Sequence, residues 1–136
     1  MKSALDTSLL IDVREGLPRA RAALSEAVAA GALLVCGAVF AELLAGGRPP
    51  DVVSRFLDDL GVEVDAATGL ELWTLAGERH ARYAARRRAA GVPDDRRLLL
   101  ADFIVGAHGV LRADCLVTRD GGAYAAYFPE LTLHRY

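Results

Sequence analysis

Short apolar runs alternate along the chain with stretches whose apolar residues recur at helical spacing. The short runs lie at residues 2–5, 33–36, 62–64, 115–117 and 131–133. Each is shorter than an ordinary helix, and glycines or polar residues flank most of them, so each predicts a strand. Because residues 33–36 and 115–117 are apolar without alternation, we expect strands that are buried on both faces, as in a parallel sheet.

The segments between these strands carry signals for helices. One or two turns of helix are expected at residues 9–13, after an Asp6-Thr7-Ser8 sequence that suits an N-cap. Further helices are expected at residues 19–30, at 38–45, from Pro49-Pro50 to Leu60, from a Thr68 cap to about Ala90, at 97–111 and at 124–127. This alternation of strands and helices predicts an α/β sandwich around a mostly parallel sheet, built as a single domain over residues 1–136.

Composition narrows the class of protein. The chain has 136 residues, of which 53% are hydrophobic and 25% charged, so one compact core is expected. No apolar run is long enough to cross a bilayer and the first residues do not form a secretory leader, so we expect a cytoplasmic protein without a membrane segment. Cys36 and Cys115 lie in strand-like runs, where we expect them to be small buried hydrophobes. The net charge of −2 requires any contact with nucleic acid to be local.

Four carboxylates occupy unusual positions. Asp6 follows the first apolar run, and Asp120 closely follows the run at residues 115–117. Glu42 and Asp102 each lie within an otherwise apolar segment, at residues 38–44 and 98–105. A charge in such surroundings costs several kcal/mol unless it is paired or bound to a metal. These acids therefore require a physical reason.

A shared metal site is one such reason. Ligands gather outside the carboxyl ends of the strands in an α/β sheet, where Asp6 and Asp120 are expected, and helices beside this crevice can bring Glu42 and Asp102 to it. Four oxygen donors without a nearby histidine or cysteine suit Mg²⁺ or Mn²⁺. Such an ion can orient a water molecule and stabilise negative charge on a phosphate.

Each acid also has a simpler interpretation. Asp6 can be a plain N-cap, and Asp120 can be a turn residue before two glycines. Glu42 and Asp102 can be partners of buried arginines. These alternatives are strongest when each acid is considered alone, and weaker for all four together.

The order of these motifs resembles that of the PIN-domain family, over essentially the whole chain. The resemblance rests on Asp6-Thr7-Ser8, Ala41-Glu42-Leu43, the segment from Ala101 to Ala107, and Thr118-Arg119-Asp120. It implies a PIN-like three-layer sandwich with a mostly parallel central sheet flanked by helices. It also implies an endoribonuclease that hydrolyses RNA phosphodiester bonds with Mg²⁺ or Mn²⁺.

The resemblance assigns roles to residues and implies partners. Asp6 and Asp102 would be the principal metal ligands, Glu42 and Asp120 would complete the acidic pocket, and Thr118 would be a hydroxyl residue beside it. A small PIN domain is most similar to the VapC toxins. This likeness implies an antitoxin protein that blocks the site, and a homodimer.

One dense basic stretch remains, between Arg79 and Arg97. Within it, Arg86 and Arg87 are candidates for contacts with RNA phosphates. The alternative is a solvated helix face that pairs with Glu78, Asp94 and Asp95.

Two other functional classes also fit part of the pattern. A catalytically inactive PIN-like module that binds RNA or protein shares the fold, but keeping all four acids speaks against it. A receiver-like phospho-acceptor module needs a lysine at its site, and Lys2 is poorly placed to serve.

Overall fold

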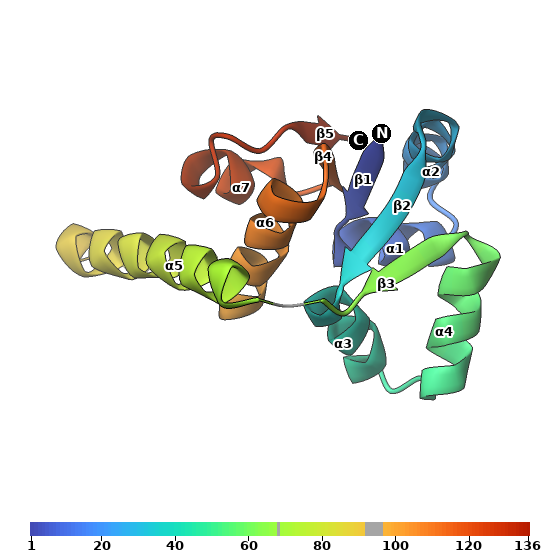
Figure 1. The fold of residues 1–136 in the computed structure, drawn as a ribbon, viewed down its shortest axis with the longest axis horizontal. Helices are drawn as coiled ribbons and strands as arrows, with labels where there is room; N and C mark the ends of the chain where they lie inside the picture. The colour runs from blue at the N-terminus through green and yellow to red at the C-terminus, as the bar shows by residue number, and fades with distance from the viewer. Residues whose placement is uncertain (68, 92–96) are drawn as a thin grey trace.

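Five parallel strands form one sheet in the computed structural model, which describes residues 1–67, 69–91 and 97–136. The strands are β1 (Lys2–Leu5), β2 (Ala32–Cys36), β3 (Val62–Asp65), β4 (Cys115–Thr118) and β5 (Leu133–Arg135). They lie in the order β3-β2-β1-β4-β5 (Figure 1), and every neighbouring pair is parallel. The parallel sheet expected from the uninterrupted apolar runs is therefore confirmed.

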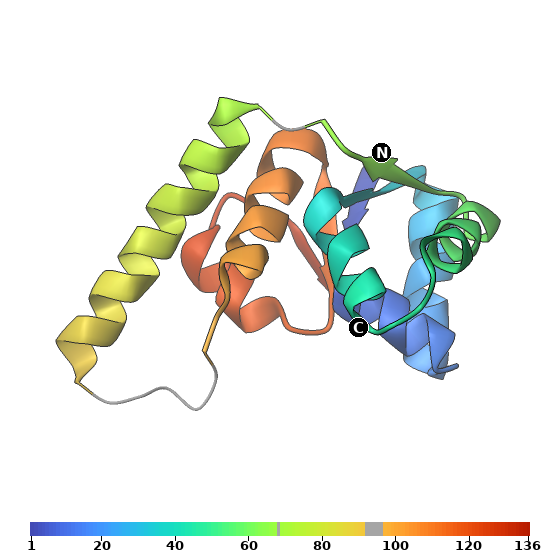
Figure 2. The ribbon, with the colours of Figure 1, turned by 90° about the horizontal axis from the view of Figure 1, so that it is seen from below.

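Helices cover the sheet on both faces. They are α1 (Thr7–Arg14), α2 (Pro18–Ala30), α3 (Gly37–Ala45), α4 (Pro50–Asp59), α5 (Leu70–Ala90), α6 (Leu100–Arg112) and α7 (Gly121–Tyr127). Helix α2 packs on β1 and β2, whereas α6 packs on β1 and β4 from the opposite side. Helix α5 lies along α6, and α3 contacts both α1 and α6 (Figure 2). This arrangement is the expected three-layer α/β sandwich.

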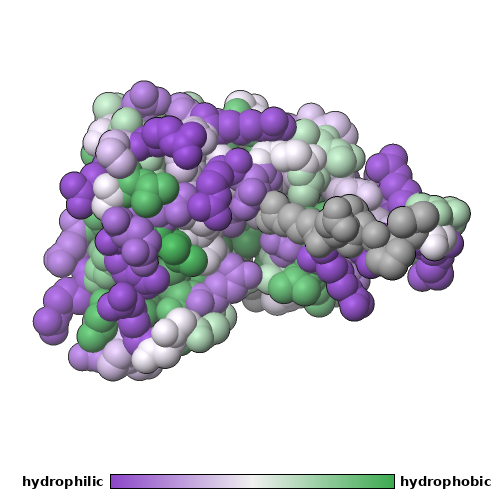
Figure 3. Space-filling view, turned by 180° about the vertical axis from the view of Figure 1, so that it is seen from behind, coloured by the Kyte–Doolittle hydropathy of each residue, from purple (hydrophilic) through white to green (hydrophobic). Residues whose placement is uncertain are grey.

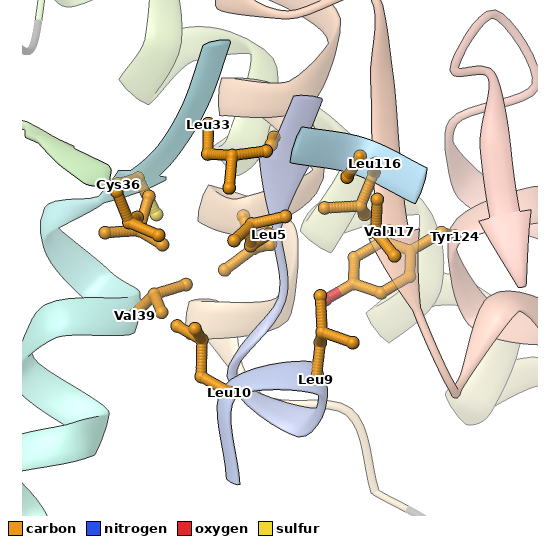
Figure 4. Packing of buried hydrophobic residues seen from close by; sticks show 14 of the residues in the cluster. Leu5, Leu9, Leu10, Leu33, Cys36, Val39, Leu116, Val117 and Tyr124 are labelled. Atoms are coloured by element: carbon orange, nitrogen blue, oxygen red, sulfur yellow. The ribbon is translucent and has the colours of Figure 1, made fainter. Parts of the chain in front are cut away.

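The core fills the space between the sheet and these helices. Leu5, Leu116 and Val117 from the central strands are at most 1% exposed, and they pack with Leu9 and Leu10 of α1 (Figure 4). Burial of side chains on both faces explains why residues 33–36 and 115–117 are apolar without alternation. The two cysteines are buried and unpaired, as predicted.

The predicted start of the helix at residue 97 is wrong, because α6 begins at Leu100. The backbone N–H of Leu98 donates to the hydroxyl of Tyr83 at 2.8 Å, and the N–H of Leu99 donates to Oδ2 of Asp102 at 2.7 Å. These two hydrogen bonds satisfy backbone N–H groups that precede the helix. The apolar run at residues 98–100 therefore contains the segment that leads into the helix and its first residue.

The C-terminal boundaries also differ from those predicted. Helix α7 begins at Gly121 rather than at Tyr124, and β5 covers residues 133–135 rather than 131–133. Leu131 is buried, but its backbone N–H closes a turn to the carbonyl of Phe128 at 3.0 Å. Leu131 is thus an apolar core residue in a turn, and its apolar side chain made it resemble a strand residue in the sequence. The predicted cap Thr68 lies outside the described residues, and so does the connection expected at residues 91–95 except for Gly91; Gly69 holds the N-cap position of α5.

Much of the surface opposite the view of Figure 1 is hydrophilic, with smaller apolar areas between the polar side chains (Figure 3). None of the helices in the described ranges is both long enough and apolar enough to span a bilayer.

Close packing of α6 against the segment after α7 depends on Gly106. A Cβ atom built at Gly106 would overlap the ring of Phe128, which is 2% exposed. The missing side chain lets Phe128 lie directly against the helix that carries Asp102. Gly77 on α5 is a contrasting helical glycine, because a Cβ there would meet nothing within 4 Å.

These two glycines give a matched test of the packing. Gly106→Ala should lower the free energy of unfolding by about 1–3 kcal/mol, the usual cost of overpacking a core. Gly77→Ala should raise it by about 0.5–1 kcal/mol, because alanine favours the helix. Urea unfolding of both variants measures the two effects, and a Gly106→Ala protein as stable as the wild type would contradict the packing described here.

Candidate functional site

The chain reverses its direction across the sheet between β1 and β4. From β1 it proceeds outward to β2 and β3, then crosses back to β4 on the other side of β1. The carboxyl ends of β1 and β4 therefore meet at a topological switch point, where α/β proteins commonly bind ligands. The backbone N–H of Asp6 donates to the carbonyl of Val117 at 3.1 Å, which fixes the two strand ends to each other.

Asp6 lies at this point and is held by three neighbours. Its Oδ2 accepts a hydrogen bond from Oγ1 of Thr118 at 2.7 Å and a longer one from Oγ of Ser8 at 3.3 Å. Its Oδ1 accepts from the backbone N–H of Thr7 at 2.8 Å, so Asp6 is also the N-cap of α1. The side chain is 9% exposed. The capping interpretation is thus correct, but it explains only one of the three contacts.

Two further acids reach the same place from helices. Glu42 on α3 is half-buried and accepts a hydrogen bond from the hydroxyl of Thr7, the residue next to Asp6. Asp102 lies in the first turn of α6 and caps it through Leu99. Neither acid forms an ion pair with an arginine among the residues that the structure describes, contrary to the alternative interpretation.

The charges of these three acids act on one another. Burial raises the pKa of Asp6; the hydrogen bonds from Thr118, Thr7 and Ser8 oppose this rise, and the charge of Asp102 adds to it. Burial also raises the pKa of Glu42, against the hydrogen bond from Thr7, and the charges of Asp6 and Asp102 raise it further. The fold therefore places three carboxylates close enough to repel one another.

Asp120 is connected to this cluster through Thr118. The backbone N–H of Asp120 donates to Oγ1 of Thr118 at 3.1 Å, and the same hydroxyl donates to Asp6. Thr118 is fully buried, and Asp120 takes the N-cap position of α7. Thr118 thus links the two strand-end acids, as a hydroxyl residue beside the site should.

Two residues around the acids were missed by sequence reasoning. Ser8 supports Asp6 directly, and its place two residues after an N-cap aspartate could have indicated this. Tyr124 is 4% exposed, and its ring points into the core beside Leu9 and Val117 (Figure 4). Burial raises the pKa of Tyr124, and the charges of the three clustered acids raise it further. Tyr124 therefore borders the acidic cluster from the core side.

The two candidate RNA-binding arginines lie elsewhere, on α5. The guanidinium of Arg86 lies over the ring of Tyr127, 5.4 Å from its centroid. Arg87 donates to the hydroxyl of Tyr83 at 3.1 Å and lies over the same ring. Both arginines thus pack on aromatic rings near α7, and the structure does not bring them into the acidic cluster. Asp94 and Asp95, their alternative partners, lie outside the described residues.

The donor set fits a hard divalent cation. In the described part of the chain, no three carboxylate, imidazole or thiolate groups stand as a ready-made metal cage. Mg²⁺ does not require such a cage, because it keeps several waters and binds one or two carboxylates directly. The clustered donors are all carboxylate oxygens, which suit Mg²⁺ or Mn²⁺ rather than a softer metal.

Comparison with known proteins defines the family. The chain matches the PIN domain over residues 4–129 and therefore belongs to the PIN-domain family. No curated protein sequence gives a significant match to it.

Solved structures share the fold over nearly their full length. VapBC-1 from nontypeable Haemophilus influenzae has a TM-score of 0.68 at 19% identity, and the alignment covers 99% of this chain and 98% of that one. VapBC2 from Rickettsia felis, bound to a promoter DNA fragment, has a TM-score of 0.70 at 17% identity, with 100% and 99% covered. A toxin–antitoxin complex from Klebsiella pneumoniae has a TM-score of 0.62 at 19% identity, with 98% and 99% covered.

Repulsion within the cluster predicts an unusual effect on stability. A raised folded-state pKa means that Glu42 stabilises the fold at a pH below its unfolded value, and that this contribution is lost as the pH rises through the folded-state pKa. Glu42→Gln removes the charge but keeps an oxygen that can accept from Thr7. Without divalent cations, this variant should melt at the same temperature as the wild type or higher at pH 7, and any advantage should disappear near pH 4.

Thermal unfolding at the two pH values measures this effect. Glu78→Gln, an exposed change on α5, is the matched control and should show no pH-dependent difference. If Glu42→Gln melts several degrees below the wild type at pH 7, the carboxylate stabilises the fold and the repulsion described here is wrong.

Proposed function

We propose that the chain is a metal-dependent endoribonuclease, carried by one PIN domain over residues 1–136. The observation that carries this proposal is the clustering of Asp6, Glu42 and Asp102 at the switch point of a PIN-family sheet. Such clustering of like charges destabilises the fold, and proteins tolerate this cost at functional sites. Hydrolysis of an RNA phosphodiester uses such a site, because the developing charge on phosphate needs a cation.

The hydrogen bonds that hold each acid suggest its role. Asp6 and Asp102 would hold Mg²⁺ or Mn²⁺, since Asp6 is oriented by three donors and Asp102 is fixed by its helix cap. Glu42 and Asp120 would complete the acidic pocket and orient the attacking water. Thr118 would keep the Asp6 carboxylate in position, as outer partners of metal ligands do.

The chemistry is a hydrolysis at phosphorus. A bound divalent cation would supply Lewis-acid polarisation of the phosphate and a lower pKa for water. Water forms the new P–O bond, the bond to the leaving ribose oxygen breaks, and that oxygen takes up a proton. Glu42 is suited to orient this water because it is half-buried and its raised pKa favours exchange of a proton.

The solved neighbours suggest a biological setting. They include VapBC structures and a toxin–antitoxin complex, so we propose that the chain is the toxin of a similar pair with an antitoxin protein as its partner. A homodimer and a cytoplasmic location belong to the same proposal. Leu70 and Trp73 on α5, which are 81% and 47% exposed, are apolar residues that a protein partner could cover.

The alternative function is a catalytically inactive PIN-like module that binds RNA or protein. Such a module would not need three mutually repelling carboxylates or the hydrogen bond from buried Thr118 to Asp6. Cleavage of RNA separates the two functions directly.

The decisive assay is cleavage of a mixed RNA pool by purified protein with Mn²⁺. EDTA should abolish cleavage, and Asp6→Ala and Asp102→Asn should each reduce it at least about a hundredfold, because both remove a proposed ligand. Thr118→Ala should cost roughly ten- to a hundredfold, the scale of an outer partner.

Asp58→Ala, which removes an exposed acid on α4, is the control and should cleave as the wild type does. EDTA-resistant cleavage, or full activity of Asp6→Ala, would contradict the proposed site. Complete absence of cleavage together with RNA binding would favour the inactive module.

A further inference from the structure

A cleft opens directly beside Asp120, outside the acidic cluster. It has a volume of about 510 Å³, within the range of pockets that hold small ligands, roughly 300–1,000 Å³. Asp120 lines it together with Arg119 and Arg135, and Tyr127 forms part of its wall. An acid and two arginines therefore line one cavity.

The sheet explains why Arg135 faces this cleft. Arg135 on β5 is the register partner of Thr118 on β4, and register partners on neighbouring parallel strands point to the same face. Thr118 uses that face to reach Asp6. The side chain of Arg135 then lies against Gly121, where an added Cβ would collide with the guanidinium group. Gly121 thus leaves room for Arg135 next to the acid at the start of α7.

The two arginines are in different electrostatic states. One nitrogen of Arg119 donates to both carboxylate oxygens of Asp12 at 2.9 Å, and Asp12 is only 5% exposed. Tyr136 donates to the same aspartate at 2.9 Å, so Arg119 is anchored and its charge is balanced. Among the described residues, no acidic side chain forms an ion pair with Arg135. Among the described residues that line this cleft, Arg135 is therefore the cation that can bind an external anion.

An RNA nucleotide fits the chemistry of the cleft. A guanidinium group binds phosphate through paired N–H donors, and the RNA backbone presents such a phosphate at every nucleotide. We propose that Arg135 binds the RNA phosphate adjoining the scissile bond and so positions the strand over the acidic cluster. This inference rests on the proposed ribonuclease function and extends it to a substrate subsite that the four acids do not provide.

Steady-state cleavage of an RNA pool with Mn²⁺ tests the subsite through two variants of Arg135. Arg135→Gln keeps most of the stem but loses the charge, so KM should rise about three- to tenfold with kcat within twofold of the wild type. The slope of log kcat/KM against log salt should become shallower by about 0.7, the loss of one contact with single-stranded RNA. Arg135→Lys keeps a point charge and should restore most of that slope.

Arg55→Gln is the matched control, because it removes the same charge from an exposed position on α4. It should change neither KM nor the salt slope. If stem packing on Gly121 were the only role of Arg135, the glutamine and lysine variants would behave alike, and that result would overturn the subsite.

The two proposals fail in different ways. Unchanged KM and salt slope in Arg135→Gln, with RNA still cleaved by the wild type, would overturn the subsite but leave the ribonuclease intact. Absence of both cleavage and RNA binding in the wild-type protein would overturn both. Melting temperatures of the variants separate a loss of folding from a loss of binding.

Discussion

The site depends on negative charge that is gathered at the meeting point of β1 and β4. The charge of Asp102 helps to raise the pKa of Asp6, and the charges of Asp6 and Asp102 help to raise the pKa of Glu42. A network of donors keeps Asp6 from turning away from its neighbours. The bond from Thr118 is central, because a fully buried hydroxyl on β4 orients a carboxylate at the end of β1. Repulsion among these carboxylates lowers the stability of the metal-free protein. It also favours binding of a cation, since the cation neutralises the cluster.

The packing around the cluster serves to hold it in place. Parallel pairing of β1 with β4 aligns the two strand ends, while α3 and α6, which contact each other, bring two further acids to them. Gly106 allows Phe128 to close against α6, and Gly121 allows Arg135 to lie beside the start of α7. Two glycines and the hydroxyls of Thr7, Ser8 and Thr118, which look unrelated in the sequence, thus contribute to one arrangement of charges.

Much of this arrangement could be predicted from the sequence, and the reasons are physical. Continuous apolar runs predicted the parallel strands because both faces of such strands are buried, and acids in apolar surroundings indicated the cluster. The start of α6 could not be predicted, since it depends on Tyr83, fifteen residues earlier, accepting the N–H of Leu98. The cleft at Arg135 was also hidden, because only the pairing of β5 with β4 brings that residue to Thr118. A sequence pattern reveals local periodicity, but it does not reveal which distant residues come into contact in the fold.

Direct binding of Mn²⁺ tests the central claim, that the clustered carboxylates form a cation site. Titration calorimetry of the protein at pH 7 should show Mn²⁺ binding in the wild type, no binding in Asp6→Asn, and affinity about ten- to a hundredfold weaker in Thr118→Ala. The exposed Asp58→Asn control should bind as the wild type does. Equal affinity of the wild type and Asp6→Asn, or no binding by the wild type at millimolar Mn²⁺, would contradict the account.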